Sequence, residues 1–127
     1  SKGLGFSKED RDTNIKRIGY VAAKLAQHGA VAMTAAISPY KEIRDYNRSR
    51  TKNSIEIYVE SSPDVLTKRH PKGLYKKAIA GEIKNFTGVS DPYEAPENPE
   101  VHVNSGTETL EESVQKVIDY LEKENWI

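Results

Sequence analysis

The chain lacks cysteine altogether, which excludes a disulfide framework and a thiolate zinc site and is compatible with a cytoplasmic protein. It also lacks an excess of either charge, since 19 basic residues balance 19 acidic ones. Proteins that coat nucleic acid normally carry a basic excess, so we expect no nucleic-acid partner. The longest apolar run, residues 30–37, is far too short to cross a bilayer, and we expect no membrane partner. The length of 127 residues suggests a single globular domain over residues 1–127.

Positive charge is concentrated between Lys68 and Lys84, where six cations accompany one acid, Glu82. The cations are Lys68, Arg69, Lys72, Lys76, Lys77 and Lys84. Glycines at positions 73, 81 and 88 would let this segment hinge. A mobile cationic lid over residues 68–88 would suit closure over a polyphosphate with exclusion of water. The alternative is a solvated helix face with ordinary lysines, and charge alone does not decide between the two.

Helix and strand signals alternate along the chain. The predicted order is a helix from Ser7 to Gly29, a strand over 30–36, a helix from Ser38 to about Arg50, a strand over 54–60, a helix over 63–69, a helix over 73–80, a strand over 101–104 and a last helix that begins at the capping box Thr109–Glu112. This alternation predicts an α/β fold with a parallel sheet flanked by helices.

Candidate ligand contacts come from separate parts of the chain. Ser38 follows the first predicted strand, where parallel sheets bind ligands, although it could equally serve as a helix cap. Arg11 and Asn14 share one face near a helix N-terminus, where anions are favoured. Phe6 and Phe86 lie in glycine-rich loops and could clamp a purine, although each taken singly is more typical of a core residue. The histidines show no metal-ligand spacing, so they predict no metal site.

Taken together, the motifs resemble those of the adenylylsulfate kinase family, in order and in spacing, over nearly the whole chain. They are GLGFSKEDR at 3–11, Asn14, ISPY at 37–40, KGLYKKA at 72–78, GEIK at 81–84, FTG at 86–88 and DPYEAPE at 91–97. The resemblance implies a P-loop kinase-like fold and the reaction of ATP with adenylyl sulfate to give ADP and 3′-phosphoadenylyl sulfate in sulfate assimilation, with Mg²⁺ as cofactor. It also implies a homodimer, and an ATP sulfurylase as partner or fused domain.

The resemblance further implies a set of site residues. Those expected to bind adenylyl sulfate are Phe6, Arg11, Asn14, Ile37, Ser38, Lys72, Asn85 and Phe86. In such a site Phe6 and Phe86 sandwich the adenine, Arg11 and Asn14 hold the anionic groups and the sugar, and Arg69 lies near the adenine of ATP.

In the family, the serine that matches Ser38 has been described as a phosphoserine. We assign it no catalytic role, because phosphoryl transfer to a hydroxyl needs alignment and charge neutralisation and no enzyme nucleophile. Asn85 stands where the family usually has glycine, and asparagine tolerates the left-handed backbone better than most residues.

One motif is missing from the 127 residues, the phosphate-binding G-x-x-x-x-G-K-[ST]. Without it the transferring phosphoryl group loses its electrostatic stabilisation, so these residues are expected to be inactive by themselves. We expect the substrate-binding and lid portion of an N-terminally incomplete kinase domain, because Ser1 falls within a motif. The alternatives are a P-loop-less, non-catalytic module that binds adenylyl sulfate or another nucleotide and regulates a partner, and a kinase for a different small molecule.

Overall fold

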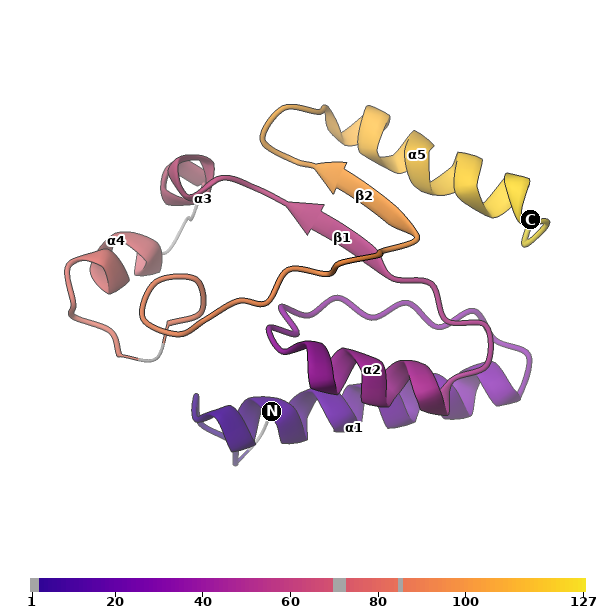
Figure 1. Cartoon of the computed structure of the whole chain (residues 1–127), viewed down its shortest axis with the longest axis horizontal. Helices are drawn as coiled ribbons and strands as arrows, with labels where there is room; N and C mark the ends of the chain where they lie inside the picture. Colours follow the sequence, from indigo (N-terminus) through magenta and orange to yellow (C-terminus); the bar gives the residue numbers. More distant parts are fainter. Residues whose placement is uncertain (1–2, 70–72, 85) are drawn as a thin grey trace. The chain divides into compact units, whose positions relative to one another are not determined.

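The computed structural model describes residues 3–69, 73–84 and 86–127. Its elements are α1 (Lys8–Gln27), α2 (Lys41–Arg50), β1 (Ile57–Glu60), α3 (Pro63–Arg69), α4 (Leu74–Ile79), β2 (Val101–Asn104) and α5 (Leu110–Lys123) (Figure 1). They form two compact units, the first made of residues 1–54 and 84–95 and the second of residues 55–83 and 96–127. No helix among the described residues is long and apolar enough to cross a membrane.

Helix α1 begins and ends where the sequence predicts. The hydroxyl of Ser7 accepts a hydrogen bond from the amide of Asp10 at 3.1 Å, which satisfies one of the amide groups left open at a helix N-terminus. At the other end Gly29 has a φ of +84°, a left-handed conformation that glycine adopts without strain. The amides of Gly29 and Ala30 then donate back to the carbonyls of Ala26 and Leu25, at 3.0 and 3.1 Å, and this closes the helix.

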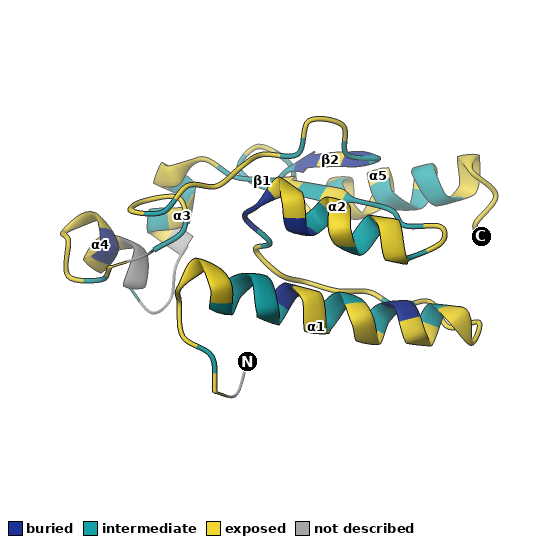
Figure 2. Ribbon diagram, turned by 60° about the horizontal axis from the view of Figure 1, so that its bottom comes forward, coloured by how far each residue is buried: buried dark blue, intermediate teal, exposed yellow. Residues whose placement is uncertain are grey.

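The first unit is held together by α1 packing against α2. Ile15, Tyr40 and Ile43 form its buried hydrophobic cluster, and Figure 2 shows buried positions on both helices. The helices come close at Gly19, where an added Cβ would lie 2.3 Å from the side chain of Asn47. Asn47 in turn donates to the carbonyl of Ile15 at 3.1 Å. The absence of a side chain at Gly19 therefore lets Asn47 reach the backbone of α1.

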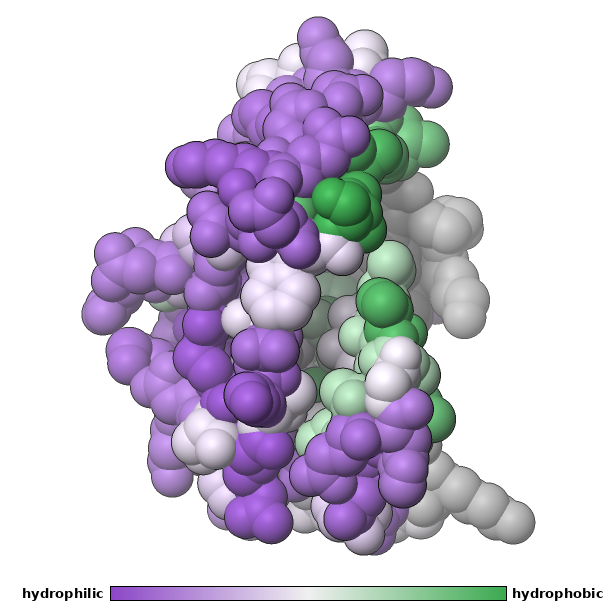
Figure 3. Space-filling view, turned by 90° about the vertical axis from the view of Figure 1, so that its right-hand side faces the viewer, coloured by the Kyte–Doolittle hydropathy of each residue, from purple (hydrophilic) through white to green (hydrophobic). Residues whose placement is uncertain are grey.

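Residues 30–36, predicted as a buried strand, form no strand in this structure. Val31 is 97% exposed and Met33 is 92% exposed. In the view of Figure 3, hydrophobic residues reach the surface among hydrophilic ones. The prediction failed because an apolar run only favours an extended backbone, whereas a strand also needs a hydrogen-bonded neighbour. The sheet of the described residues therefore has two strands, and three had been expected.

The second unit is built on the parallel pair β1 and β2, which confirms the predicted α/β class with a parallel sheet. The register places Ile57 beside Val101 and Tyr58 beside His102. Val101 and Val103 are buried, and α5 packs against β2. On the other face of the pair, the rings of Tyr58 and His102 stack with centroids 4.9 Å apart. Burial, together with the charge of Glu60, raises the pKa of Tyr58 above its ordinary value.

The remaining helices of the second unit begin at the predicted caps. The amide of Val65 donates to the hydroxyl of Ser62 at 3.4 Å at the start of α3. Thr109 and Glu112 form the predicted capping box at the start of α5. Gly73 precedes α4 with a φ of +61° and Gly81 follows it with a φ of +78°, so the glycines of the cationic segment do adopt left-handed conformations.

Candidate functional site

The N-terminus of α2 is capped by a residue far away in the sequence. Ser38 had been predicted as a candidate N-cap, but the helix begins later and Tyr40 occupies the cap position without a side-chain hydrogen bond. The carboxylate of Glu94 instead accepts a hydrogen bond from the amide of Lys41 at 2.6 Å. The amide of Glu94 donates to the carbonyl of Pro39 at 2.8 Å. A negative charge at this position also complements the positive end of the helix dipole.

Arg44 fixes the backbone before α2 by reaching back from the first turns of the helix. Its guanidinium donates through Nη1 to the carbonyl of Ser38 at 2.8 Å and through Nη2 to the carbonyl of Glu94 at 2.7 Å. Ser38 has a φ of +43°, which is unusual for a residue with a side chain. Such strain persists only where surrounding contacts enforce it, and it is common at ligand sites. Arg44 and Glu94 together supply those contacts.

Replacing Ser38 with glycine is expected to raise the free energy of unfolding by about 0.5 kcal/mol. Relief of the left-handed backbone is worth roughly 1 kcal/mol, and the greater freedom of glycine in the unfolded chain offsets part of it. Ser38→Ala is the matched control, since it removes the hydroxyl and keeps the strain. Urea denaturation followed by circular dichroism would measure both variants, and a Ser38→Gly variant no more stable than Ser38→Ala would contradict the expectation.

Arg11 joins the start of α1 to the loop that follows Phe86. Its Nη1 donates to the hydroxyl of Thr87 at 2.6 Å, and its Nη2 lies 3.2 Å from a carboxylate oxygen of Asp91. The Arg11 side chain is 12% exposed and that of Asp91 is 21% exposed. Two of the predicted substrate contacts, Arg11 and Phe86, therefore belong to one connected structure.

The other predicted contacts are arranged less tightly. Phe6 lies in the loop before α1, with 76% of its surface exposed, and the carboxylate of Asp10 holds this loop by accepting from the amide of Gly5 at 3.0 Å. Ile37 is exposed beside Ser38. Arg69 is the last residue of α3. Lys72 and Asn85 lie outside the described residues.

A second cation of the first turn of α1 faces α2. The ammonium of Lys8 lies 4.7 Å from the centre of the Tyr40 ring and 2.8 Å from the carboxylate of Asp12. The hydrogen bond to Asp12 raises the pKa of Lys8 above its ordinary value. Lys8 and Arg11 are thus both paired with carboxylates, those of Asp12 and Asp91 respectively.

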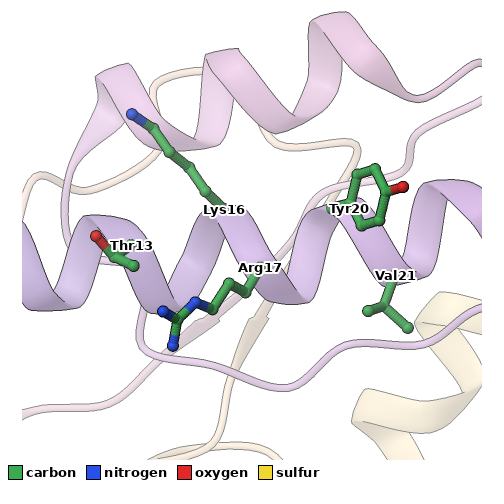
Figure 4. A pocket seen from close by; sticks show the side chains of 5 residues that line it. All are labelled: Thr13, Lys16, Arg17, Tyr20 and Val21. Carbon is green, nitrogen blue, oxygen red and sulfur yellow. The ribbon is translucent and has the colours of Figure 1, made fainter. Parts of the chain in front are cut away.

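Two open hollows lie along α1. The first, of about 530 Å³, is lined by Thr13, Lys16, Arg17, Tyr20 and Val21, all from the one helix. Figure 4 shows that Lys16 and Arg17 point away from each other, so their charges do not converge on a ligand. The second, of about 500 Å³, lies between α1 and residues 31–34 and includes Asn14. Asn14 thus borders a concave, mostly apolar surface, and Arg11 does not line it.

Sequence reasoning missed four residues that shape this region: Arg44, Thr87, Asp91 and Glu94. A usable signal was present for Asp91 and Glu94, because residues 91–100 form a proline-rich loop that carries several carboxylates. Charged residues in a rigid loop are suited to holding other segments, and here they do so.

The cofactor Mg²⁺ implied by the resemblance finds no ligand set in the part of the chain that the structure describes. No group of three or more His, Asp or Glu side chains there is arranged to hold a metal ion. The described side chains therefore offer no preformed metal site of their own.

Comparison with known proteins agrees with the resemblance. A sequence model of the family described as adenylylsulphate kinase matches residues 1–104. A protein of Sorangium cellulosum named as a probable bifunctional SAT/APS kinase is 61% identical over 127 residues, which are 100% of this chain and 22% of that protein. An adenylyl-sulfate kinase of Rippkaea orientalis is 55% identical over 97% of this chain and 68% of its own length.

A solved structure shares the fold. The APS kinase of Mycobacterium tuberculosis, in complex with AMPPNP and APS, superposes with a TM-score of 0.85 at 39% identity, over 94% of this chain and 70% of that one. The chain therefore spans less than a quarter of the bifunctional relative and about two thirds of the monofunctional ones.

Proposed function

Because the chain belongs to the adenylylsulphate kinase family, we propose that it supplies the adenylyl sulfate-binding portion of an enzyme that phosphorylates the 3′-hydroxyl of that nucleotide with ATP. The observation that carries this proposal is the link from Arg11 to Thr87 and Asp91, next to Phe86. An anchored guanidinium and an aromatic residue on the adjoining loop are suited to an anionic adenine nucleotide, since a cation binds phosphate or sulfate and an aromatic ring stacks on a base.

The contribution of these residues is to bind and orient the acceptor. Phe86 and Phe6 hold the adenine, Arg11 and Asn14 hold the anionic groups and the sugar, and the strained turn at Ser38 shapes the pocket. Phosphoryl transfer depends mainly on alignment and on neutralising charge, so a fixed acceptor hydroxyl is a large part of the catalysis. The other part, a phosphate-binding G-x-x-x-x-G-K-[ST] loop, is absent from the 127 residues and has to come from outside them.

Lys72 and Arg69 are the remaining residues of the proposed site. Lys72 contacts the adenylyl sulfate from the cationic lid over residues 68–88, and Arg69 serves the adenine of ATP. Gly73 and Gly81 both have a positive φ, which glycine adopts freely, and this supports hinge motion of the lid. The relative whose name joins SAT and APS kinase supports an ATP sulfurylase as a fused or partner domain.

Titration calorimetry with adenylyl sulfate tests the binding site. Replacing Phe86 with alanine is expected to weaken binding about tenfold, since a stacked base contributes roughly 1–3 kcal/mol. Tyr20→Ala is the matched control, because it removes an exposed aromatic ring from α1 in the same unit.

Three results would count against the proposal. Absence of measurable binding by the wild-type chain would rule out the site as a whole. Equal losses in Phe86→Ala and Tyr20→Ala would rule out stacking on Phe86. Equal affinity for adenylyl sulfate and for an unrelated phosphorylated alcohol would favour a kinase of another small molecule.

A further inference from the structure

The guanidinium of Arg11 is held before any ligand is present. Thr87 accepts from Nη1 at 2.6 Å and Asp91 pairs with Nη2 at 3.2 Å. Both partners come from a loop some 76 residues further along the chain than Arg11. A free arginine side chain populates many rotamers, so fixing it from two sides removes most of that freedom.

The loop that provides these partners is itself rigid. The carbonyl of Phe86 accepts hydrogen bonds from the amides of Val89, Ser90 and Asp91, at 3.1, 3.0 and 3.1 Å. The amide of Phe86 donates to the hydroxyl of Ser90 at 2.7 Å, and the amide of Gly88 donates to the carbonyl of Asp91 at 2.8 Å. The backbone of Phe86 is therefore tied directly to Asp91.

The Arg11–Asp91 ion pair is partly shielded from solvent. Exposed pairs contribute little, because water and salt screen them and their side chains stay mobile. Arg11 and Asp91 are 12% and 21% exposed, whereas the i,i+4 pair Lys41–Asp45 is 50% and 57% exposed. A charge-assisted bond in the drier position is stronger and more directional.

We propose that Asp91 is a positioning residue for adenylyl sulfate. It holds Arg11 in its binding conformation and ties it to the loop that carries Phe86, so that the anion contact and the stacking contact are in place before the nucleotide arrives. Preorganisation of this kind raises affinity by reducing the entropy lost on binding. This inference rests on the proposed function, since it concerns the same site.

The alternative role for the Asp91 carboxylate, competition with the substrate, predicts the opposite change in affinity. If Asp91 competed with the substrate anion for Arg11, its removal would tighten binding. The hydrogen bonds of the 86–91 loop fix the backbone of Asp91 and so keep its carboxylate within reach of Arg11, which favours positioning.

The experiment is a titration of the full chain with adenylyl sulfate, comparing wild type, Asp91→Asn, Arg11→Ala and the double variant. Asp91→Asn keeps the shape of the side chain and removes its charge. We expect it to weaken binding about tenfold. In the Arg11→Ala background the same change is expected to cost less than about twofold, because Asp91 acts through Arg11. Asp45→Asn, which neutralises an exposed carboxylate, is the control and leaves affinity unchanged.

A second variant and a second measurement guard against a folding defect. Thr87→Val removes the other partner of Arg11 and is expected to weaken binding about threefold. Amide hydrogen exchange at Gly88 in the ligand-free protein is expected to become faster in Asp91→Asn and to stay unchanged in Asp45→Asn.

The outcomes distinguish the proposed function from the positioning role of Asp91. No binding by wild type overturns the proposed function itself. Wild-type binding with an unchanged or tighter Asp91→Asn variant overturns only the positioning role, as do additive losses in the double variant. Faster exchange at Gly88, together with non-additive losses, supports it.

Discussion

Replacing Arg11 with alanine is expected to weaken binding of adenylyl sulfate about a hundredfold, since a hydrogen bond to a charged group contributes roughly 1.5–3 kcal/mol. The substitution removes the cation at the positive end of α1 and also releases Thr87 and Asp91, which it holds at 2.6 and 3.2 Å. Asp91 then loses this partner and no longer holds a cation in the site. Titration calorimetry would measure the loss.

Arg17→Ala is the matched control for this prediction. Arg17 lies on the same helix, is exposed, and lines both open hollows without contacting Thr87 or Asp91 in any described hydrogen bond or ion pair. Its removal changes the net charge equally, and affinity is expected to stay within about twofold. Equal losses in the two variants would show that binding responds to overall charge and that Arg11 makes no specific contact.

Ile43→Ala is expected to lower the free energy of unfolding by about 3 kcal/mol, as is typical when a buried isoleucine is truncated to leave a cavity. Ile43 is only 3% exposed and packs with Ile15 and Tyr40 between α1 and α2. Tyr40 and Arg44 flank it in the helix that fixes the turn at Ser38, so loosening this cluster also disturbs the candidate site.

Urea denaturation would measure this effect against Ile79→Ala, which truncates the same residue type at a 60% exposed position on α4. The control is expected to change stability by less than about 0.5 kcal/mol. Similar midpoints for the two variants, with equal slopes, would show that the cluster around Ile43 does not hold the first unit together.

Local signals explain which parts of the fold could be predicted. The ends of α1, α3 and α5 depend on residues within a few positions of one another, as at Ser7–Asp10 and Thr109–Glu112, and these predictions are confirmed. The strand over 30–36 was wrong because strand formation depends on a neighbour that composition does not reveal. The cap at Ser38 was wrong because Glu94, 53 residues away from Lys41, takes that role.

The candidate site likewise has features that local signals predict and contacts that they do not. Arg11 and Phe86 were chosen separately, one for its position at a helix start and the other for its glycine-rich surroundings, and the family resemblance joined them. That Thr87 and Asp91 link them physically could not be predicted, since it depends on contacts between segments far apart in the sequence. The roles of all the predicted site residues, Lys72, Asn85 and Arg69 included, stay predictions.

The long reach of Glu94 has a consequence for how the protein is made. Residues 55–83 separate the two stretches of the first unit, so a nascent chain exposes α1 and α2 well before Glu94 emerges. Until then the first amide of α2 lacks its acceptor and the carbonyl of Pro39 its donor. Contacts of such sequence separation slow folding, because the intervening chain has to be ordered first. Completion of the helix pair therefore waits on translation of the proline-rich loop.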